Sequence, residues 1–257
     1  MNTERFGNRV AIVTGGAKGI GAATTRLLAR GGAAVVIGDT DLEAGAMLVE
    51  ELRTEGNPAS FVATDVSQAV DARRLIECTE EQFGAVDILI NNAGIALAKS
   101  TTETSEEEWD RIIRVNLTGA WLCAKFAIPA MKRRGGGAIV NVASNAGLVG
   151  FPNLAAYCAS KGGLVLLTKA MALDCARDKI RVNAVCPGHT RTPMGDGFVA
   201  AQPNPEAFIA EFINGQHPIG RMAEANEIAE VIGFLASGAA SFVTGAVLAA
   251  DGGYTTR

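Results

Sequence analysis

The sequence has few of the residues from which metal sites, disulfide frameworks and membrane spans are built. Of 257 residues only two are histidine, and the five cysteines are odd in number and scattered, without a Cys-x-x-Cys pair. This pattern favours free thiols in a reducing compartment and gives a metal centre little support. No apolar stretch approaches the roughly 20 residues that a membrane helix needs. Residues 1–5 lack the apolar core of a secretory signal, so we expect a cytoplasmic protein without a membrane partner.

Positive charge is not in excess either. The formal net charge is −4, with 23 Lys and Arg against 27 Asp and Glu. A chain with this balance has no broad electrostatic footprint for nucleic acid, so we expect no nucleic-acid partner. The abundant residues are hydrophobic ones, at 48%, and glycine, with 30 residues. That combination is typical of a buried parallel sheet with tight turns.

A strand, a glycine turn, a helix, a second strand and an acid follow one another near the start of the chain. Residues 10–13 predict a buried strand, 22–30 a helix, and 35–39 a strand that ends in Asp39. Glycines let the backbone approach a pyrophosphate, and a helix N-terminus offers it N–H donors. The spacing Gly-x-x-x-Gly-x-Gly differs from the Gly-x-Gly-x-x-Gly fingerprint, but its context predicts a dinucleotide site. These glycines are Gly15, Gly19 and Gly21.

Tyr157 and Lys161 stand four residues apart in the segment 155–176, whose pattern predicts a helix. That spacing places a phenol and an ammonium on one helix face, within contact distance. At an effective dielectric constant near ~20, an ammonium about 4 Å from a phenolate stabilises it by roughly 4 kcal/mol, or about 3 pKa units. We therefore expect Lys161 to lower the pKa of Tyr157 toward neutrality, which would suit it to proton transfer.

The rest of the chain continues the alternation of strands and helices without a linker. Apolar, β-rich runs predict five more strands, and a second long helix is predicted over 105–131. We therefore predict one α/β domain over 1–257, a Rossmann-type doubly wound parallel sheet flanked by helices. Such sheets bind ligands at the carboxyl ends of their strands. The five further strands are predicted at 60–64, 87–90, 138–142, 181–185 and 246–249.

These motifs resemble those of the short-chain dehydrogenase/reductase family, from about Asn8 to the C-terminus. The likeness rests on the turn 14–21, on 91–94 (Asn-Asn-Ala-Gly) and on Pro187-Gly188 with Thr192. It implies a catalytic tetrad formed by Asn116, Ser144, Tyr157 and Lys161. It also implies a cofactor site formed by Gly15, Lys18, Gly19, Ile20, Gly21, Asp39, Asp65, Val66, Asn92, Ala93, Gly94, Tyr157, Lys161, Pro187, Gly188, Thr190 and Thr192.

The resemblance implies a role for each member of the tetrad in hydride transfer between a dinucleotide and a secondary alcohol or ketone. Tyr157 exchanges a proton with the alcohol, and Ser144 donates a hydrogen bond to the substrate oxygen. Lys161 reaches the nicotinamide ribose, and Asn116 holds a water that connects Lys161 to solvent. The family resemblance also implies a homotetramer.

Asp39 bears on the choice of cofactor. It lies 18 residues after Gly21, near the ~20-residue spacing at which an acid accepts hydrogen bonds from the adenosine ribose hydroxyls. A 2′-phosphate at that place would meet like charge. Lys18 favours NADP instead, because family members that use NADP often have a basic residue just before the second glycine. Nothing basic follows Asp39 through residue 45, so we expect NAD and regard NADP as the less favoured cofactor.

Residues 189–220 suit a mobile substrate lid with an apolar inner face, or a helix that packs in the core. Arg191 and Arg221 only bracket the apolar part, so phosphorylated substrates have weak support. We expect a small or medium-sized, uncharged and partly apolar alcohol or ketone as the substrate, in contact with at least one of three lid phenylalanines. These are Phe198, Phe208 and Phe212.

Three other functions share this pattern in whole or in part. A 3-oxoacyl-thioester reductase has the same fold and tetrad but usually favours NADPH, against Asp39. A sugar or polyol dehydrogenase also uses NAD, although the predicted lid is apolar. A non-catalytic dinucleotide-binding regulator needs Asp39 and the glycines but not Tyr157, so the complete tetrad argues against it.

Overall fold

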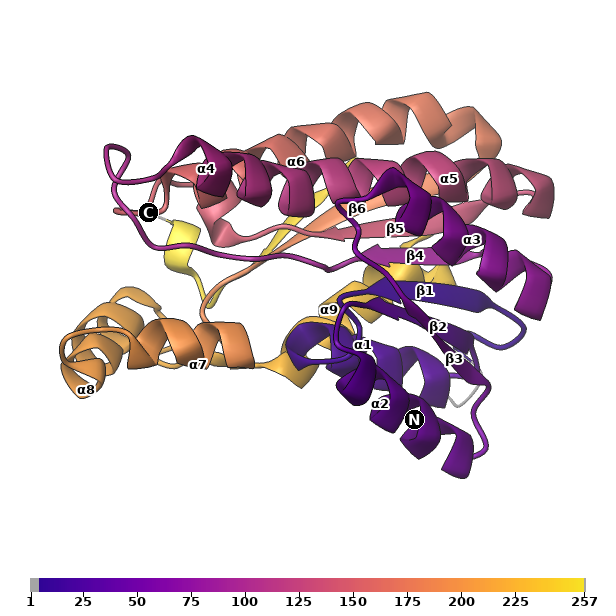
Figure 1. The fold of residues 1–257 in the computed structure, drawn as a ribbon, viewed down its shortest axis with the longest axis horizontal. Helices are drawn as coiled ribbons and strands as arrows, with labels where there is room; N and C mark the ends of the chain where they lie inside the picture. Colours follow the sequence, from indigo (N-terminus) through magenta and orange to yellow (C-terminus); the bar gives the residue numbers. More distant parts are fainter. Residues whose placement is uncertain (1–4, 257) are drawn as a thin grey trace.

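A computed structural model describes residues 5–256, apart from the side chain of Phe212. Its centre is a seven-stranded sheet of order β3-β2-β1-β4-β5-β6-β9, in which every neighbouring pair is parallel (Figure 1). The seven strands match those predicted from the sequence, and their order confirms the doubly wound sheet. They are β1 (Val10–Thr14), β2 (Ala34–Asp39), β3 (Ala59–Ala63), β4 (Ile88–Asn91), β5 (Gly137–Val142), β6 (Ile180–Pro187) and β9 (Val247–Ala250).

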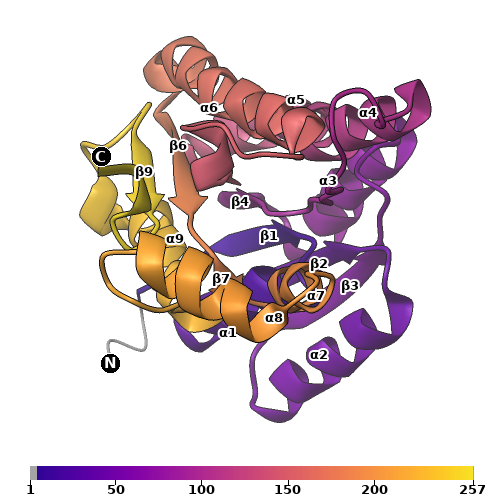
Figure 2. The same ribbon diagram turned by 90° about the vertical axis from the view of Figure 1, so that its left-hand side faces the viewer.

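Helices cover both faces of this sheet (Figures 1 and 2). Each layer buries aliphatic side chains against the strands, and the strands are apolar almost throughout because both of their faces are covered. One layer contains α1 (Gly19–Arg30), α2 (Leu42–Thr54) and α9 (Ala225–Ala236). The other contains α3 (Ala69–Phe83), α5 (Gly119–Arg134) and α6 (Ala155–Cys175).

A smaller group of elements lies at the carboxyl ends of the strands, apart from the two helix layers (Figure 1). It has a small core of its own, formed by Val199, Ile213 and Met222, with Phe208 and Ile209 packed against them. The predicted motion of the segment 189–220 as a lid stays a prediction. The elements are β7 (Thr190–Arg191), α7 (Pro193–Ala200), α8 (Pro205–Ala207), the π-helical turn Phe208–Asn214 and β8 (Ala223–Glu224). Helix α4 (Glu106–Ile113) lies on the other side of the cleft and packs on α6, in the second helix layer (Figure 1).

The single helix predicted over 105–131 is divided in the structure. The chain runs through α4, a π-helical turn at Arg114–Thr118 and then α5. Asn116 lies in this turn, and its amide exchanges two hydrogen bonds with the backbone of Ile95, at 2.9 Å and 2.8 Å. The wider turn thus directs Asn116 toward the loop that follows β4, and this long-range contact accounts for the interruption.

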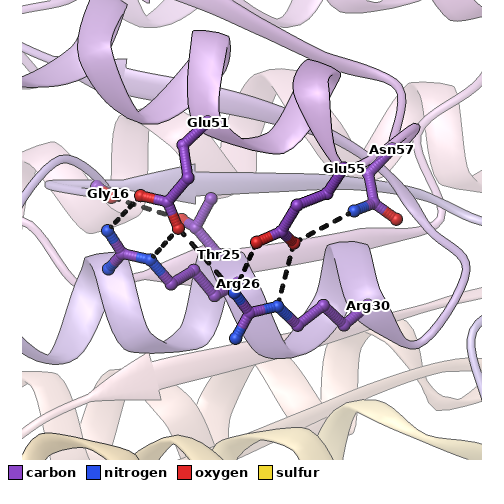
Figure 3. Close-up of polar contacts among 7 residues, drawn as sticks. All are labelled: Gly16, Thr25, Arg26, Arg30, Glu51, Glu55 and Asn57. Atoms are coloured by element: carbon purple, nitrogen blue, oxygen red, sulfur yellow. Dashed lines mark hydrogen bonds and ion pairs between the residues drawn. The ribbon is translucent and has the colours of Figure 1, made fainter.

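Two arginines of α1 hold α2 beside it (Figure 3). Arg26 donates two hydrogen bonds to Glu51, both at 2.7 Å, and Arg30 donates two to Glu55, at 3.0 Å and 2.7 Å. The two pairs stand one helical turn apart and have the forked geometry that makes such contacts directional. Because the side chains are partly exposed, each pair stabilises the fold only slightly, and the main result is a fixed placement of α1.

The turn between β1 and α1 depends on glycine. Gly15 and Gly19 have φ values of +60° and +55°, a backbone conformation that residues with a side chain rarely adopt. A Cβ atom on Gly21 would lie 1.9 Å from the carbonyl oxygen of Gly15. Asn92, from the end of β4, donates its amide to the carbonyl oxygens of Thr14 and Gly15 at 3.1 Å and 2.8 Å. Backbone contact and the Asn92 amide therefore set the direction in which α1 begins.

We expect Gly21→Ala to destabilise the protein, although alanine favours helices over glycine by about 1 kcal/mol. The new methyl group would overlap the Gly15 carbonyl, and overpacking of this kind costs about 1–3 kcal/mol or more. Gly238→Ala is the matched control, because no atom lies within 4 Å of its added Cβ. Calorimetric melting should show a lower Tm for Gly21→Ala alone, and equal Tm values for the two variants would contradict this role of Gly21.

Candidate active site

A cleft of about 1090 Å³ opens at the carboxyl ends of the strands. Its size suits a dinucleotide together with a small second ligand. Seventeen of the nineteen residues predicted from the sequence for the catalytic and cofactor sites line this cleft. The two exceptions are Gly21, which faces the inside of the glycine turn, and Asn116, which is fully buried.

Helix α6 brings Tyr157 and Lys161 to the cleft on one face. Lys161 is only 4% exposed, and its ammonium donates a hydrogen bond to the carbonyl oxygen of Val142, at the end of β5, at 2.8 Å. The same ammonium lies 5.7 Å from the centre of the Tyr157 ring. Ser144, which follows β5, lies near the phenol of Tyr157, and its hydroxyl lowers the pKa of that phenol. Three of the four tetrad side chains are therefore neighbours in the cleft.

The pKa of Tyr157 differs from the prediction. Burial raises the pKa of this phenol, and the Ser144 hydroxyl opposes the rise only in part. Burial also lowers the pKa of Lys161 to about 8. The expected acidic tyrosine is therefore wrong for this structure, because Lys161 is directed to the Val142 carbonyl and both charged forms lose hydration on burial.

Asn116 lies behind the other tetrad residues. Besides its contacts with Ile95, its amide donates to the Ser160 hydroxyl at 3.0 Å, and that hydroxyl donates to the backbone carbonyl of Tyr157 at 2.7 Å. Asn116 thus connects the loop after β4 to the first turns of α6. Its predicted role as a water ligand stays a prediction.

The glycine turn and the end of β2 form the opposite part of the cleft. No side chain caps the N-terminus of α1 and no acid stands in its first turn, so N–H groups near Gly19 and Ile20 are available to an anion. Asp39 accepts hydrogen bonds from the backbone N–H groups of Ala17 and Asp41, at 3.0 Å each. A carboxylate has further acceptor capacity after two such bonds. These residues fit a nicotinamide dinucleotide, with donors for its pyrophosphate and an acceptor for its ribose.

Lys18, which complicated the choice between NAD and NADP, forms an ion pair with Asp41. The contact raises the pKa of Lys18 and lowers that of Asp41. Asp41 also caps α2 by accepting a hydrogen bond from the N–H of Ala44 at 3.0 Å. An acid that is fixed by its own helix therefore compensates the charge of Lys18.

Aromatic rings gather in the wall of the cleft that the segments 145–154 and 189–208 provide. Among the described lining residues of these two segments there is no Asp, Glu, Lys or Arg. Burial lowers the pKa of His189 to about 4, so its imidazole is neutral at pH 7. This wall is consequently uncharged, and a carboxylate or phosphate group would find no cation in it. The rings are Phe151, His189, Phe198 and Phe208.

The sequence predicted part of this wall. Phe198 and Phe208 were expected there, whereas the side chain of Phe212 lies outside the described residues. Phe151 was missed, and so were Arg111 and Arg114, which also line the cleft. A single apolar residue in a loop carries no signal of its own. The two arginines could have been found from their position just before Asn116.

In the part of the chain that the structure describes, no group of three His, Cys, Asp or Glu residues could hold a metal ion. Residues 5–256 also contain no helix that is long and apolar enough to cross a membrane. The five cysteines are free thiols.

Known proteins resemble this chain over nearly its whole length. Residues 15–255 match a protein-family model described as enoyl-(acyl carrier protein) reductase. The chain is 47% identical over 253 residues to cis-4-hydroxycyclohexanecarboxylate dehydrogenase of Sinomonas cyclohexanicum, with 98% of each chain covered. It is 40% identical over 260 residues to cyclohexanol dehydrogenase of Acinetobacter sp. strain SE19, covering 99% of this chain and 98% of the relative. Among solved structures, levodione reductase aligns with a TM-score of 0.95 at 34% identity, covering 98% of this chain and 100% of the other.

Proposed function

The chain belongs to the short-chain dehydrogenase/reductase family, and from this premise we propose that it is an NAD-dependent dehydrogenase of neutral alicyclic secondary alcohols. Its reaction class is the interconversion of a secondary alcohol and a ketone. One observation carries the finer proposal: the half-buried Tyr157 and the buried Lys161 lie in one cleft with a dinucleotide cradle and an uncharged aromatic wall. The names of two relatives denote dehydrogenases of ring alcohols, which supports an alicyclic substrate. One of these named substrates carries a carboxylate, so the neutral substrate is proposed from the uncharged wall of the cleft.

Proton transfer is carried out by the tetrad residues of α6 and of the turn that follows β5. A bound nicotinamide supplies the hydride acceptor. Tyr157 takes the hydroxyl proton of the alcohol onto its phenolate oxygen as the C–H bond breaks, and in the reverse direction it returns that proton. Ser144 donates its hydroxyl to the substrate oxygen and so holds the carbinol beside Tyr157. Burial raises the pKa of Tyr157, so the phenolate has to form within the cleft. We propose that the Lys161 ammonium, held by the Val142 carbonyl 5.7 Å from the centre of the Tyr157 ring, offsets part of the cost of that negative charge.

We propose NAD rather than NADP because of the charges around the end of β2. Asp39 lines the cleft and offers a carboxylate to the ribose hydroxyls, whereas a 2′-phosphate there would meet the like charge of Asp39. Lys18 does not offset this charge, since its ammonium is already paired with Asp41. We propose that the glycine turn makes the remaining contacts with the cofactor, together with the loop that contains Pro187, Gly188, Thr190 and Thr192.

Wild-type protein should form NADH from NAD and cyclohexanol, followed by absorbance, and should be at least about tenfold less efficient with NADP. Asp39→Ala should narrow this gap mainly by improving NADP affinity, because it removes repulsion of the 2′-phosphate. Asp174→Ala, at an exposed position of α6, is the control and should leave the preference unchanged.

Two results would contradict the proposal in different ways. A wild-type preference for NADP would overturn the assignment of Asp39 and favour the acyl-thioester reductase alternative. Failure to form NADH with any of a panel of cyclic and acyclic secondary alcohols would overturn the substrate class.

We also propose a cytoplasmic homotetramer. The free thiols suit a reducing compartment. Large apolar side chains are exposed on two faces of the chain, with Leu166 and Leu173 on α6 and with Phe242 and Leu248 at the β9 edge of the sheet. Two self-complementary patches, each used across its own two-fold axis, generate a tetramer with dihedral symmetry.

Sedimentation velocity should give a mass about four times the 26.6 kDa of one chain. Leu173→Asp should reduce this to a dimer, because an unpaired charge in an apolar contact disfavours one of the two interfaces. Val70→Asp, at a side chain 70% exposed on α3, is the matched control and should remain tetrameric. A wild-type mass of one chain would contradict assembly.

A further inference from the structure

Four aromatic side chains from distant segments contact one another in a closed circuit beside the cleft. Phe151 stacks on Tyr254, with ring centres 5.2 Å apart and an angle of 15° between the planes. Tyr254 lies 5.1 Å from His217, His217 lies 5.2 Å from His189, and His189 lies 6.4 Å from Phe151. Phe151 and His189 line the cleft, whereas Tyr254 and His217 are outside its lining. We name these four residues the aromatic circuit.

Tyr254 comes from the C-terminal turn that follows β9, and this turn is firmly attached to the cofactor loop. The N–H of Gly188 donates to the carbonyl oxygen of Ala250 at 3.1 Å. Asp251 is only 5% exposed and accepts hydrogen bonds from the N–H and the hydroxyl of Thr255, at 2.9 Å and 2.6 Å. Tyr254 therefore lies between Asp251 and Thr255, which these hydrogen bonds hold together.

The same turn contacts the end of the segment 189–220. The N–H of Ile219 donates to the carbonyl oxygen of Gly252 at 3.2 Å. A Cβ atom on Gly253 would lie 3.0 Å from the side chain of Pro218, so the backbone of Gly253 lies close to the proline ring. His217 is 3% exposed, and its Nδ1–H donates to the carbonyl oxygen of Ile213 at 2.7 Å, which fixes the plane of its ring. The C-terminal turn thus joins the lid end to the sheet.

We propose that Tyr254 is a positioning residue for substrate binding, a role that rests on the proposed function. Stacked on Phe151 and packed on His217, it fixes the two circuit rings, Phe151 and His189, that face the substrate. His189 also contacts Phe198 and Phe208, with ring centres 6.3 Å away in both cases, so the effect extends to the lid helices. A rigid, uncharged wall of rings binds a neutral carbocycle through dispersion contacts and burial of apolar surface.

Steady-state kinetics with cyclohexanol and NAD test this role. Tyr254→Ala should raise the KM for cyclohexanol about tenfold while kcat and the KM for NAD change by less than about twofold, because the ring stacks on Phe151 and packs on His217, whereas the cofactor loop is held by backbone hydrogen bonds that the variant keeps. Tyr254→Phe keeps the stack on Phe151 and should restore the wild-type KM. A loss confined to kcat, or equal KM values for cyclohexanol in the alanine variant and the wild type, would overturn the proposal.

Hydrogen–deuterium exchange tests the same claim without turnover. Tyr254→Ala should exchange faster than the wild type in residues 148–154 and 213–219, and α1 and α2 should be unchanged. Tyr254→Phe should match the wild type. Unchanged exchange in both segments, or an equal effect of the phenylalanine variant, would overturn the positioning role. Wild-type protein that is inactive with every alcohol would instead contradict the proposed function, and the exchange result would still decide the role of Tyr254.

Discussion

The hydrogen bond from the Lys161 ammonium to the Val142 carbonyl oxygen holds the reacting groups of the cleft together. Val142 is the last residue of β5 that pairs with β6, so its carbonyl lies where the parallel ladder ends. The contact ties α6 to that point and places Tyr157, one helical turn earlier, next to Ser144. The cost is the burial of an amine, which lowers the pKa of Lys161 to about 8. A doubly wound sheet thereby provides both the acceptor and the water-poor setting that proton transfer needs.

Local patterns were sufficient to predict the sheet and much of the cleft. Apolar runs bounded by glycine and polar residues predicted all seven strands, and the comparisons confirm the family resemblance. The prediction of one continuous helix over 105–131 was wrong at the π-helical turn Arg114–Thr118. A local pattern cannot reveal the hydrogen bonds between Asn116 and Ile95, which lie 21 residues apart. The roles assigned to individual site residues stay predictions, although their shared position in one cleft supports them.

Features that depend on which groups meet in the folded chain could not be predicted. The sequence shows that Lys18 stands before a glycine, but only the fold pairs it with Asp41. In the same way, spacing suggested that Lys161 would dominate the pKa of Tyr157, whereas burial by the surrounding segments dominates it. The contacts of the aromatic circuit are another such feature, since its four rings come from separate parts of the chain and only His189 lies within a motif, that of residues 187–192.

In the proposed mechanism Tyr157 carries the proton while other residues bind the dinucleotide, and the variant Tyr157→Phe separates these two functions. The direct measurement is the single-turnover rate of NADH formation after cyclohexanol is mixed with the NAD-loaded variant, together with the Kd for NAD by fluorescence titration. The account predicts a rate at least about 10² below that of the wild type, with the Kd within about twofold. A variant that keeps the wild-type rate would remove Tyr157 from the mechanism and contradict the account.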